Sequence, residues 1–185
     1  LAAQLPFRID IQMHPATAPT PVSGYISSVL LKSALFGLVK LFLVLGGGTA
    51  LVSGLTATTG AASGLTSLMD IVVWVGAVTI VMAAGFAVFQ KDLKLVLIYS
   101  TVSQLGYMVA GVGLGSSLGI AGGLLHLVNH MFFKDLLFLV CGAVMFATHR
   151  ETLDDLGGIG RQMPFTLAMF AIAGLSVVGV PPTSG

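Results

Sequence analysis

Long apolar stretches separated by short polar connections dominate this sequence and limit what it can fold into. A helix that crosses the hydrocarbon core of a bilayer needs about 20 consecutive, mostly apolar residues. Five stretches reach or approach that length: 23–42, 68–89, 95–114, 118–148 and 163–180. Only 8% of the 185 residues are charged, which is too few to cover a water-facing surface. We therefore expect an all-α, polytopic membrane helix bundle, surrounded by the lipid bilayer and by other membrane subunits.

The five stretches predict one transmembrane domain over residues 1–185. The sequence starts at Leu1 and stops inside an apolar segment, so we expect an excerpt of a longer chain with helices missing on both sides. Pro181 and Pro182 are expected to break or end the fifth helix, because proline lacks an N–H donor and clashes with the preceding turn. A break at membrane depth is tolerated where the freed backbone lines a cavity or packs on protein.

The basic residues predict how the bundle is oriented. With five helices, the loops before the first, after the second and after the fourth lie on one side of the membrane. The basic residues of those loops are Arg8, Lys91, Lys94, Arg150 and Arg161. The opposite loops hold no lysine or arginine, although Lys40 can extend toward them from the first helix. The side rich in lysine and arginine is therefore expected to be cytoplasmic.

Several other functions are excluded or disfavoured by the residues themselves. A net charge of +1 without a basic patch predicts no nucleic-acid partner. The single cysteine, Cys141, supports neither a disulfide nor a metal cluster. The glycines at 111, 113 and 115 have the spacing of a dinucleotide-binding loop. No strand precedes them, and we interpret them as helix-packing residues. The sequence thus predicts no cofactor, no metal and no catalytic centre of its own.

Two lysines lie near the middle of predicted spans, Lys32 in the first and Lys134 in the fourth. A charged residue at the centre of the bilayer costs about 2.5–3.5 kcal/mol on insertion scales. One interpretation is that each lysine pairs with a carboxylate on a missing helix and only stabilises assembly. The other is a relay site, because burial disfavours the charged form of lysine and lets it gain and lose a proton near neutral pH.

The fourth span favours the relay. His126, His130 and Lys134 follow one another at four-residue steps, so they lie along one helix face. Histidine titrates near neutral pH and can take a proton on one ring nitrogen and release it from the other. The histidines could instead be packing residues; a zinc site lacks the His-Glu-x-x-His pattern. Lys94, at the start of the third span, is either a surface anchor or the mouth of a water path.

Four motifs carry a resemblance to a known family. They are residues 18–23 (APTPVS), 92–94 with 99–107 (DLK and YSTVSQLGY), 126–134 (HLVNHMFFK) and 179–182 (GVPP). In this order they resemble the antiporter-like, proton-translocating subunits of respiratory complex I, Mrp-type cation/proton antiporters and membrane-bound hydrogenases. The resemblance implies an inverted-repeat fold with broken helices, of which this excerpt holds about five helices, the last broken near the two prolines.

The resemblance also implies a function and a set of residues. The proton or ion pathway would include Lys32, Lys94, His126, His130 and Lys134. The chain would be a proton-translocating membrane-arm subunit of a complex I-like oxidoreductase, of the NADH-quinone or hydrogenase type, in a prokaryotic plasma membrane. A subunit of a multi-subunit Na⁺/H⁺ antiporter is the first alternative. A non-conducting structural subunit is the second, since Leu1 stands where the family has a lysine.

Overall fold

The structure, a computed structural model, describes residues 18–45, 61–181 and 183. Over these residues it is helical, apart from turns and one isolated β-bridge. The helices are α2 (Thr20–Tyr25), the π-helix η1 (Ile26–Leu30), α3 (Leu31–Leu45), α4 (Ala61–Val88), α5 (Leu93–Gly113), α6 (Ser117–Thr148), the 3₁₀-helix η2 (Leu153–Asp155), α7 (Ile159–Gln162) and α8 (Pro164–Val178). The predicted all-α bundle is confirmed.

Within the described residues, four helical stretches are long and apolar enough to cross a membrane. They are Thr20–Leu41, Met69–Val88, Leu93–Gly113 and Ser117–Thr148, and each coincides with a predicted span to within a few residues. The second helix is longer than predicted, because α4 already begins at Ala61 within the stretch that the glycine and threonine content assigned to a loop.

The fifth predicted span is a shorter helix. Helix α8 has 15 residues, which at 1.5 Å per residue is about 22 Å and less than the hydrocarbon thickness. It ends at Val178, and Gly179 caps it in the left-handed conformation (φ 78°), donating its N–H to the carbonyls of Leu175 and Ser176. Pro181 follows this cap outside the helix, and Pro182 lies outside the described residues.

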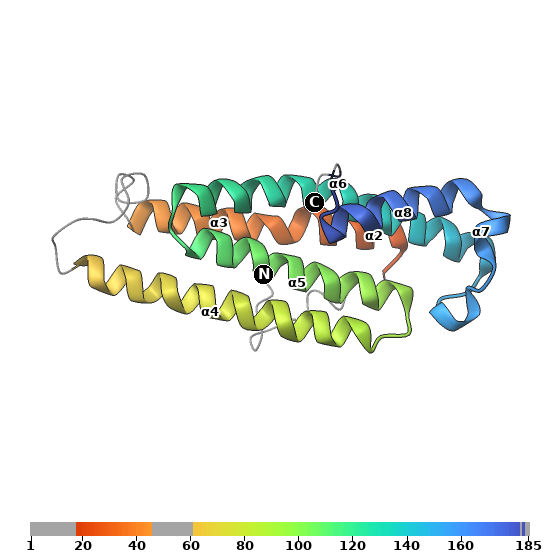
Figure 1. The fold of residues 1–185 in the computed structure, drawn as a ribbon, viewed down its shortest axis with the longest axis horizontal. Helices are drawn as coiled ribbons and strands as arrows, with labels where there is room; N and C mark the ends of the chain where they lie inside the picture. Colours follow the sequence, from red (N-terminus) through yellow and green to blue (C-terminus); the bar gives the residue numbers. More distant parts are fainter. Residues whose placement is uncertain (1–17, 46–60, 182, 184–185) are drawn as a thin grey trace.

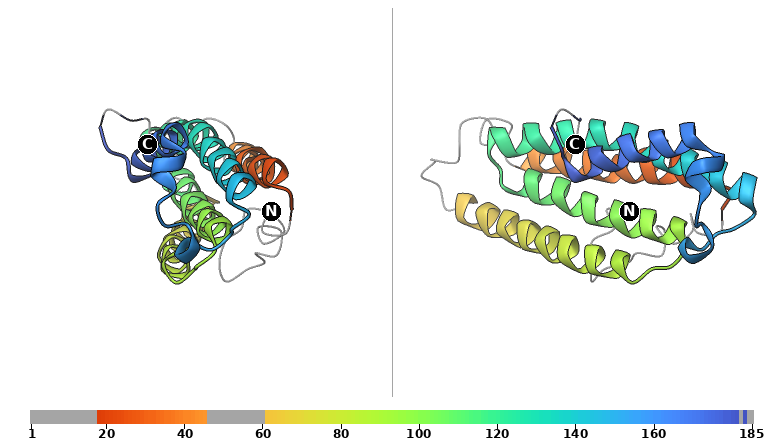
Figure 2. Two further views of the ribbon diagram at one scale, coloured as in Figure 1. Left: turned by 90° about the vertical axis from the view of Figure 1, so that its right-hand side faces the viewer. Right: turned by 45° about the vertical axis from the view of Figure 1, so that its right-hand side comes forward.

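Helix α5 occupies the centre of the bundle. It runs between α4 on one side and the layer of α3, α6 and α8 on the other (Figures 1 and 2). Helix α6 in turn packs against α2 and η1 on one flank and against α8 on the other. Whatever α5 and α6 carry on their shared face therefore lies away from lipid.

Glycines allow α5 to approach its neighbours closely. A Cβ added to Gly106 of α5 would lie 2.9 Å from the carbonyl oxygen of Gly76 in α4. On the other side of the helix, a Cβ on Gly119 of α6 would lie 2.6 Å from the carbonyl oxygen of Gly111. Residues with side chains would push these helices apart. The packing role predicted for the glycines around the α5–α6 turn is therefore confirmed.

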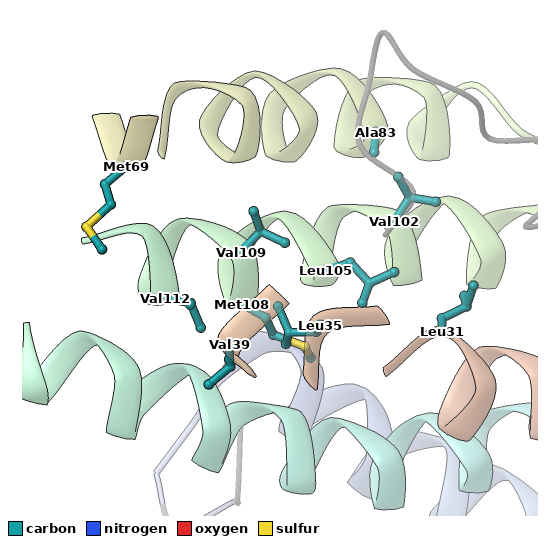
Figure 3. Close-up of a cluster of buried hydrophobic side chains, with 10 residues drawn as sticks. All are labelled: Leu31, Leu35, Val39, Met69, Ala83, Val102, Leu105, Met108, Val109 and Val112. Carbon is teal, nitrogen blue, oxygen red and sulfur yellow. The ribbon is translucent and has the colours of Figure 1, made fainter. Parts of the chain in front are cut away.

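The largest apolar cluster joins α3, α4 and α5. Its members are Leu31, Leu35, Val39, Met69, Ala83, Val102, Leu105, Met108, Val109 and Val112 (Figure 3). Helices α3 and α4 contribute to this cluster from opposite sides of α5. The cluster therefore holds α3, and with it Lys32, against the central helix α5.

The two basic loops within the described residues meet at one end of the bundle. The N–H of Leu93 donates to the carbonyl of Glu151 (3.2 Å), and that of Leu153 donates to the carbonyl of Lys91 (2.9 Å). The side chains of Lys91 and Asp154 also approach to 3.6 Å. The α4–α5 turn and the α6–α8 loop are therefore on the same side, as the five-helix prediction requires. Arg8 lies outside the described residues, and which side is cytoplasmic stays a prediction.

Candidate functional site: a polar core between three helices

Lys32 lies at the start of α3, immediately after the π-helical turn η1. Its side chain is 4% exposed, and its ammonium Nζ donates to the carbonyl oxygen of Ser27. Helical side chains lean toward the N-terminus, which lets the long lysine chain reach back to a carbonyl five residues earlier. A π-turn inside an α-helix is uncommon and frequently marks a functional site. Here it interrupts the first span directly next to its buried lysine.

Two polar side chains of α5 meet two ionisable side chains of α6. The amide oxygen of Gln104 and Nε2 of His126 are 2.6 Å apart. One turn nearer the basic end, Nζ of Lys134 donates to the hydroxyl of Ser100 at 2.5 Å. Ser100 and Gln104 are one turn apart on α5, whereas Lys134 and His126 are two turns apart on α6, so the two pairs form rungs on either side of the α6 turn that carries His130.

His130 lies on α6 between the two rungs. Its ring is fully buried, and neither Nδ1 nor Nε2 has a hydrogen-bond partner among the described residues. The ring contacts Phe133 edge-on, with centroids 5.1 Å apart, and faces His126 at 6.1 Å. Buried polar groups in native proteins almost always have partners. An imidazole held at this position can hydrogen-bond to a group outside the described residues.

The lysines and histidines form one electrostatic group. Lys32 lies close enough to His126, His130 and Lys134 for its charge to act on all three. Lys134 is fully buried, and the described residues place no carboxylate within ion-pair distance of either lysine. Within the described part of the chain, the hydrogen-bond partners of these groups are therefore hydroxyl, amide and carbonyl dipoles. In such a setting the protonation of one group strongly affects the others.

Lys94 lies apart from this core. Lys94 is half-buried near the basic end of α5, and its Nζ donates to the carbonyl oxygen of Ala18, just before α2 (3.3 Å). It therefore connects the entrance of the first span to the third. Pro181 is at the far end of α8. The structure thus brings four of the five predicted pathway residues together and places Lys94 toward the membrane surface.

Ser100, Gln104 and the π-turn were not assigned to the site from the sequence. The sequence showed α5 to be unusually polar for a spanning helix, but it did not show which of its polar groups face α6. The four-residue spacing of Ser100 and Gln104 places them on one helix face, and it is the signal in the sequence that could have identified this pair. Among the described residues, no cluster of three or more His, Cys, Asp or Glu side chains is arranged to hold a metal ion.

Comparison with known proteins agrees with the family resemblance carried by the four sequence motifs. The family model described as "NADH:quinone oxidoreductase/Mrp antiporter, TM" matches residues 2–185. The chain is 45% identical over 123 residues to the F(420)H(2) dehydrogenase subunit L of Methanosarcina mazei, which covers 64% of this chain and 18% of that protein. It is 34% identical over 185 residues to the A/B component of a probable K(+)/H(+) antiporter of Rhizobium meliloti, covering 100% of this chain and 17% of that one.

The fold also has a solved counterpart. A chain of the membrane-bound sulfane sulfur reductase, an archaeal respiratory membrane complex, superposes with a TM-score of 0.80 at 25% identity. The match covers 96% of this chain and 34% of that one. The chain thus spans less than a fifth of the length of the two curated relatives and about a third of the solved one.

Proposed function

The chain belongs to the transmembrane family of NADH:quinone oxidoreductase and Mrp antiporter subunits, and on this premise we propose that it carries protons in a redox-driven membrane complex. In this proposal it is part of a membrane-arm subunit of an NADH-quinone oxidoreductase or membrane-bound hydrogenase type of complex. The protein is an integral membrane protein. Its location in a prokaryotic plasma membrane, among other membrane subunits, is part of the proposal.

One observation carries the proposal: His130 is fully buried in an apolar span, neither ring nitrogen has a hydrogen-bond partner among the described residues, and Lys32 and Lys134 are near enough for their charges to act on it. An inert spanning helix would have leucine at these positions, because buried unpaired polar groups cost about 1–3 kcal/mol each. A role in proton transfer explains why a destabilising buried histidine is present, because histidine can accept a proton on one nitrogen and release it from the other. Water entering beside His130 would connect it to the neighbouring ammonium groups.

The residues of the polar core suggest a path. A proton would move along α6 among Lys134, His130 and His126, with Ser100 and Gln104 of α5 orienting the two ends of the row. Lys32 would exchange protons with this row from α3. Lys94, nearer the membrane surface, would form the mouth of the path at the basic end. Each step needs only small side-chain movements and water between neighbouring groups.

The same charges supply coupling to a distant redox step. Two unit charges 10 Å apart interact by about 1.7 kcal/mol at an effective dielectric of 20, which exceeds one pKa unit. A change of protonation at one lysine therefore shifts the proton affinity of the next. A row of such groups can pass an electrostatic signal along the membrane without any cofactor in this chain.

The proposal is tested by neutralising Lys32 while keeping its volume. We expect Lys32→Met, in the full-length subunit of the reconstituted complex, to lose most proton pumping per electron transferred. Lys40→Met is the matched control, because Lys40 lies on the same helix α3 and its side chain is exposed. Acidification of proteoliposomes and turnover of the electron donor are measured on the same preparation, so that the ratio of protons to electrons is obtained directly.

One outcome would contradict the proposal, and a second would show that the assay does not measure proton transfer. Full pumping by both Lys32→Met and Lys134→Met would exclude these lysines from the path and favour a non-conducting structural subunit. Loss of pumping by Lys40→Met as well would show that the assay reports assembly rather than proton transfer.

A second candidate function is membership of a multi-subunit cation/proton antiporter. The match to a component of a probable K(+)/H(+) antiporter over the entire chain favours it. The same core would then carry the proton half of an exchange, driven by an ion gradient rather than by electron transfer.

A further inference from the structure

An apolar cavity of about 210 Å³ lies at the basic end of the bundle, outside the polar core. Helix α6 forms one wall and α8 the other, and the loop with η2 and α7 closes the end. Its lining includes Val140 and Val144 of α6, Leu167 and Phe170 of α8, and Ile159 of α7. Almost all of this lining is hydrocarbon, so the cavity suits an apolar chain and excludes an ion or a sugar.

A second, polar hollow of about 190 Å³ adjoins the apolar cavity. Ile159 lines both of them. The polar hollow contains one cation and one anion, the guanidinium of Arg150 and the carboxylate of Asp155, together with Thr148 and Gln162. The two hollows therefore form one amphipathic site, with an apolar part along α6 and α8 and a polar part in the loop beyond them.

The hydrogen bonds that the protein makes to Arg150 and Asp155 leave part of their hydrogen-bonding capacity free. Arg150 donates one hydrogen bond from Nη1 to the carbonyl oxygen of Asp155 (2.7 Å), whereas a guanidinium has five N–H donors. One carboxylate oxygen of Asp155 accepts from the hydroxyl of Thr152 (2.5 Å). The remaining guanidinium donors and the second carboxylate oxygen are available to a ligand that carries both an anion and a cation.

We propose that this site binds one membrane phospholipid with a zwitterionic amino headgroup, such as phosphatidylethanolamine. One acyl chain occupies the apolar cavity between α6 and α8. The phosphate receives N–H bonds from Arg150, which pairs with phosphate through its planar fork, and the ammonium group lies against Asp155. The proposal does not depend on proton transfer through the polar core.

The surroundings favour a zwitterionic over an anionic lipid. The loop between α6 and α8 contains two arginines and three acidic residues, which are Arg150, Glu151, Asp154, Asp155 and Arg161. Of these, Asp154 lies against Lys91. A headgroup with a net negative charge would gain from Arg150 but would be repelled by the adjacent carboxylates. A headgroup that offers both charges satisfies both sides of the hollow.

The test uses the full-length protein in its complex, exchanged into nanodiscs that contain equal amounts of phosphatidylethanolamine and phosphatidylglycerol. The phosphatidylethanolamine carries a photoactivatable diazirine in one acyl chain. After irradiation, we expect crosslinked peptides from the cavity walls on α6 and α8. Unlabelled phosphatidylethanolamine should compete about tenfold better than phosphatidylglycerol, the preference that one charge-assisted contact provides.

Two pairs of variants separate the site from general lipid contact. Arg150→Gln should lower the crosslinking about tenfold, whereas Arg161→Gln, which removes the same charge from an exposed position in the same loop, should leave it unchanged. Leu167→Trp fills the cavity and should abolish the crosslinks. Ile172→Trp on the same helix should not, although Leu167 and Ile172 are both 51% exposed.

The proposal is overturned by any of three results. Crosslinks that avoid the cavity walls would mean that a further helix or a neighbouring subunit fills the cavity. Equal competition by phosphatidylglycerol would rule out the amino headgroup. Equal crosslinking of Arg150→Gln and Arg161→Gln would show that Arg150 does not hold a phosphate.

Discussion

Each polar pair of the core joins an ionisable side chain to a neutral one. Lys134 donates to the hydroxyl of Ser100, and His126 meets the amide of Gln104. A hydroxyl can accept from an ammonium and can rotate its own proton toward a neutral amine, so it accommodates both protonation states of the lysine. A carboxylate in the same place would fix the lysine in its charged form. The neutral partners are therefore as important to a relay as the lysines.

Ser100→Ala tests this role at a single atom. Removing the acceptor leaves the Lys134 ammonium without its hydrogen bond in an apolar span, a loss of about 1–3 kcal/mol. We expect roughly tenfold slower proton pumping, the change that 1.4 kcal/mol in a barrier produces. The rate is measured in proteoliposomes at saturating electron donor.

Two further variants make that result specific. Ser103→Ala removes a hydroxyl that points to α4 rather than to α6, since it donates to the carbonyl of Ile80 (3.1 Å), and should leave pumping unchanged. Ser100→Thr keeps a hydroxyl and should restore most of the rate. Equal rates for Ser100→Ala and Ser103→Ala would remove Ser100 from the mechanism.

At the level of helices, the sequence predicted the features that depend on length and period. Apolar length located the spans, and the four-residue period placed His126, His130 and Lys134 on one face. It could not predict the partners of these residues, since the register between α5 and α6 is set by the close approach of Gly111 and Gly119. The π-turn before Lys32 was also not predicted, because no proline or glycine in residues 26–30 marks it.

Close helix contact gives a stability prediction for α4 and α5. A Cβ at position 106 would lie 2.9 Å from both the carbonyl oxygen of Gly76 and a side-chain carbon of Ile80. Gly106→Ala should therefore force α4 away from α5 and cost about 1–3 kcal/mol, as overpacking does elsewhere. We expect the thermal unfolding midpoint of the detergent-solubilised full-length variant to be lower than that of the unsubstituted protein.

Gly85→Ala is the matched substitution. Gly85 lies in the same helix pair, on α4, and a Cβ there would meet nothing within 4 Å. Alanine is also the better helix former by about 1 kcal/mol, so this variant should be neutral or slightly stabilised. A midpoint for Gly106→Ala as high as that for Gly85→Ala would contradict the close packing of α4 on α5.

At the level of the whole molecule, the polar core is proposed to belong to a longer row of charges. The core lies deep in the bundle, Lys94 lies toward the basic end, and the chain spans less than a fifth of the two curated relatives compared above. In the proposed function its residues pass protons between neighbours but supply no driving force. Electron transfer or an ion gradient in the rest of the assembly would then bias the row.

The two driving forces make different predictions for the assembled complex. If the proposed function is correct, the full-length protein purified with its natural partners will acidify proteoliposomes when an electron donor and acceptor are added, in the absence of a sodium or potassium gradient. Lys134→Met will uncouple this acidification from electron transfer. A component of an antiporter would instead respond to an imposed cation gradient and ignore the electron donor. Proton flux that follows the cation gradient, with no redox-active protein among the co-purified chains, would assign the chain to an antiporter.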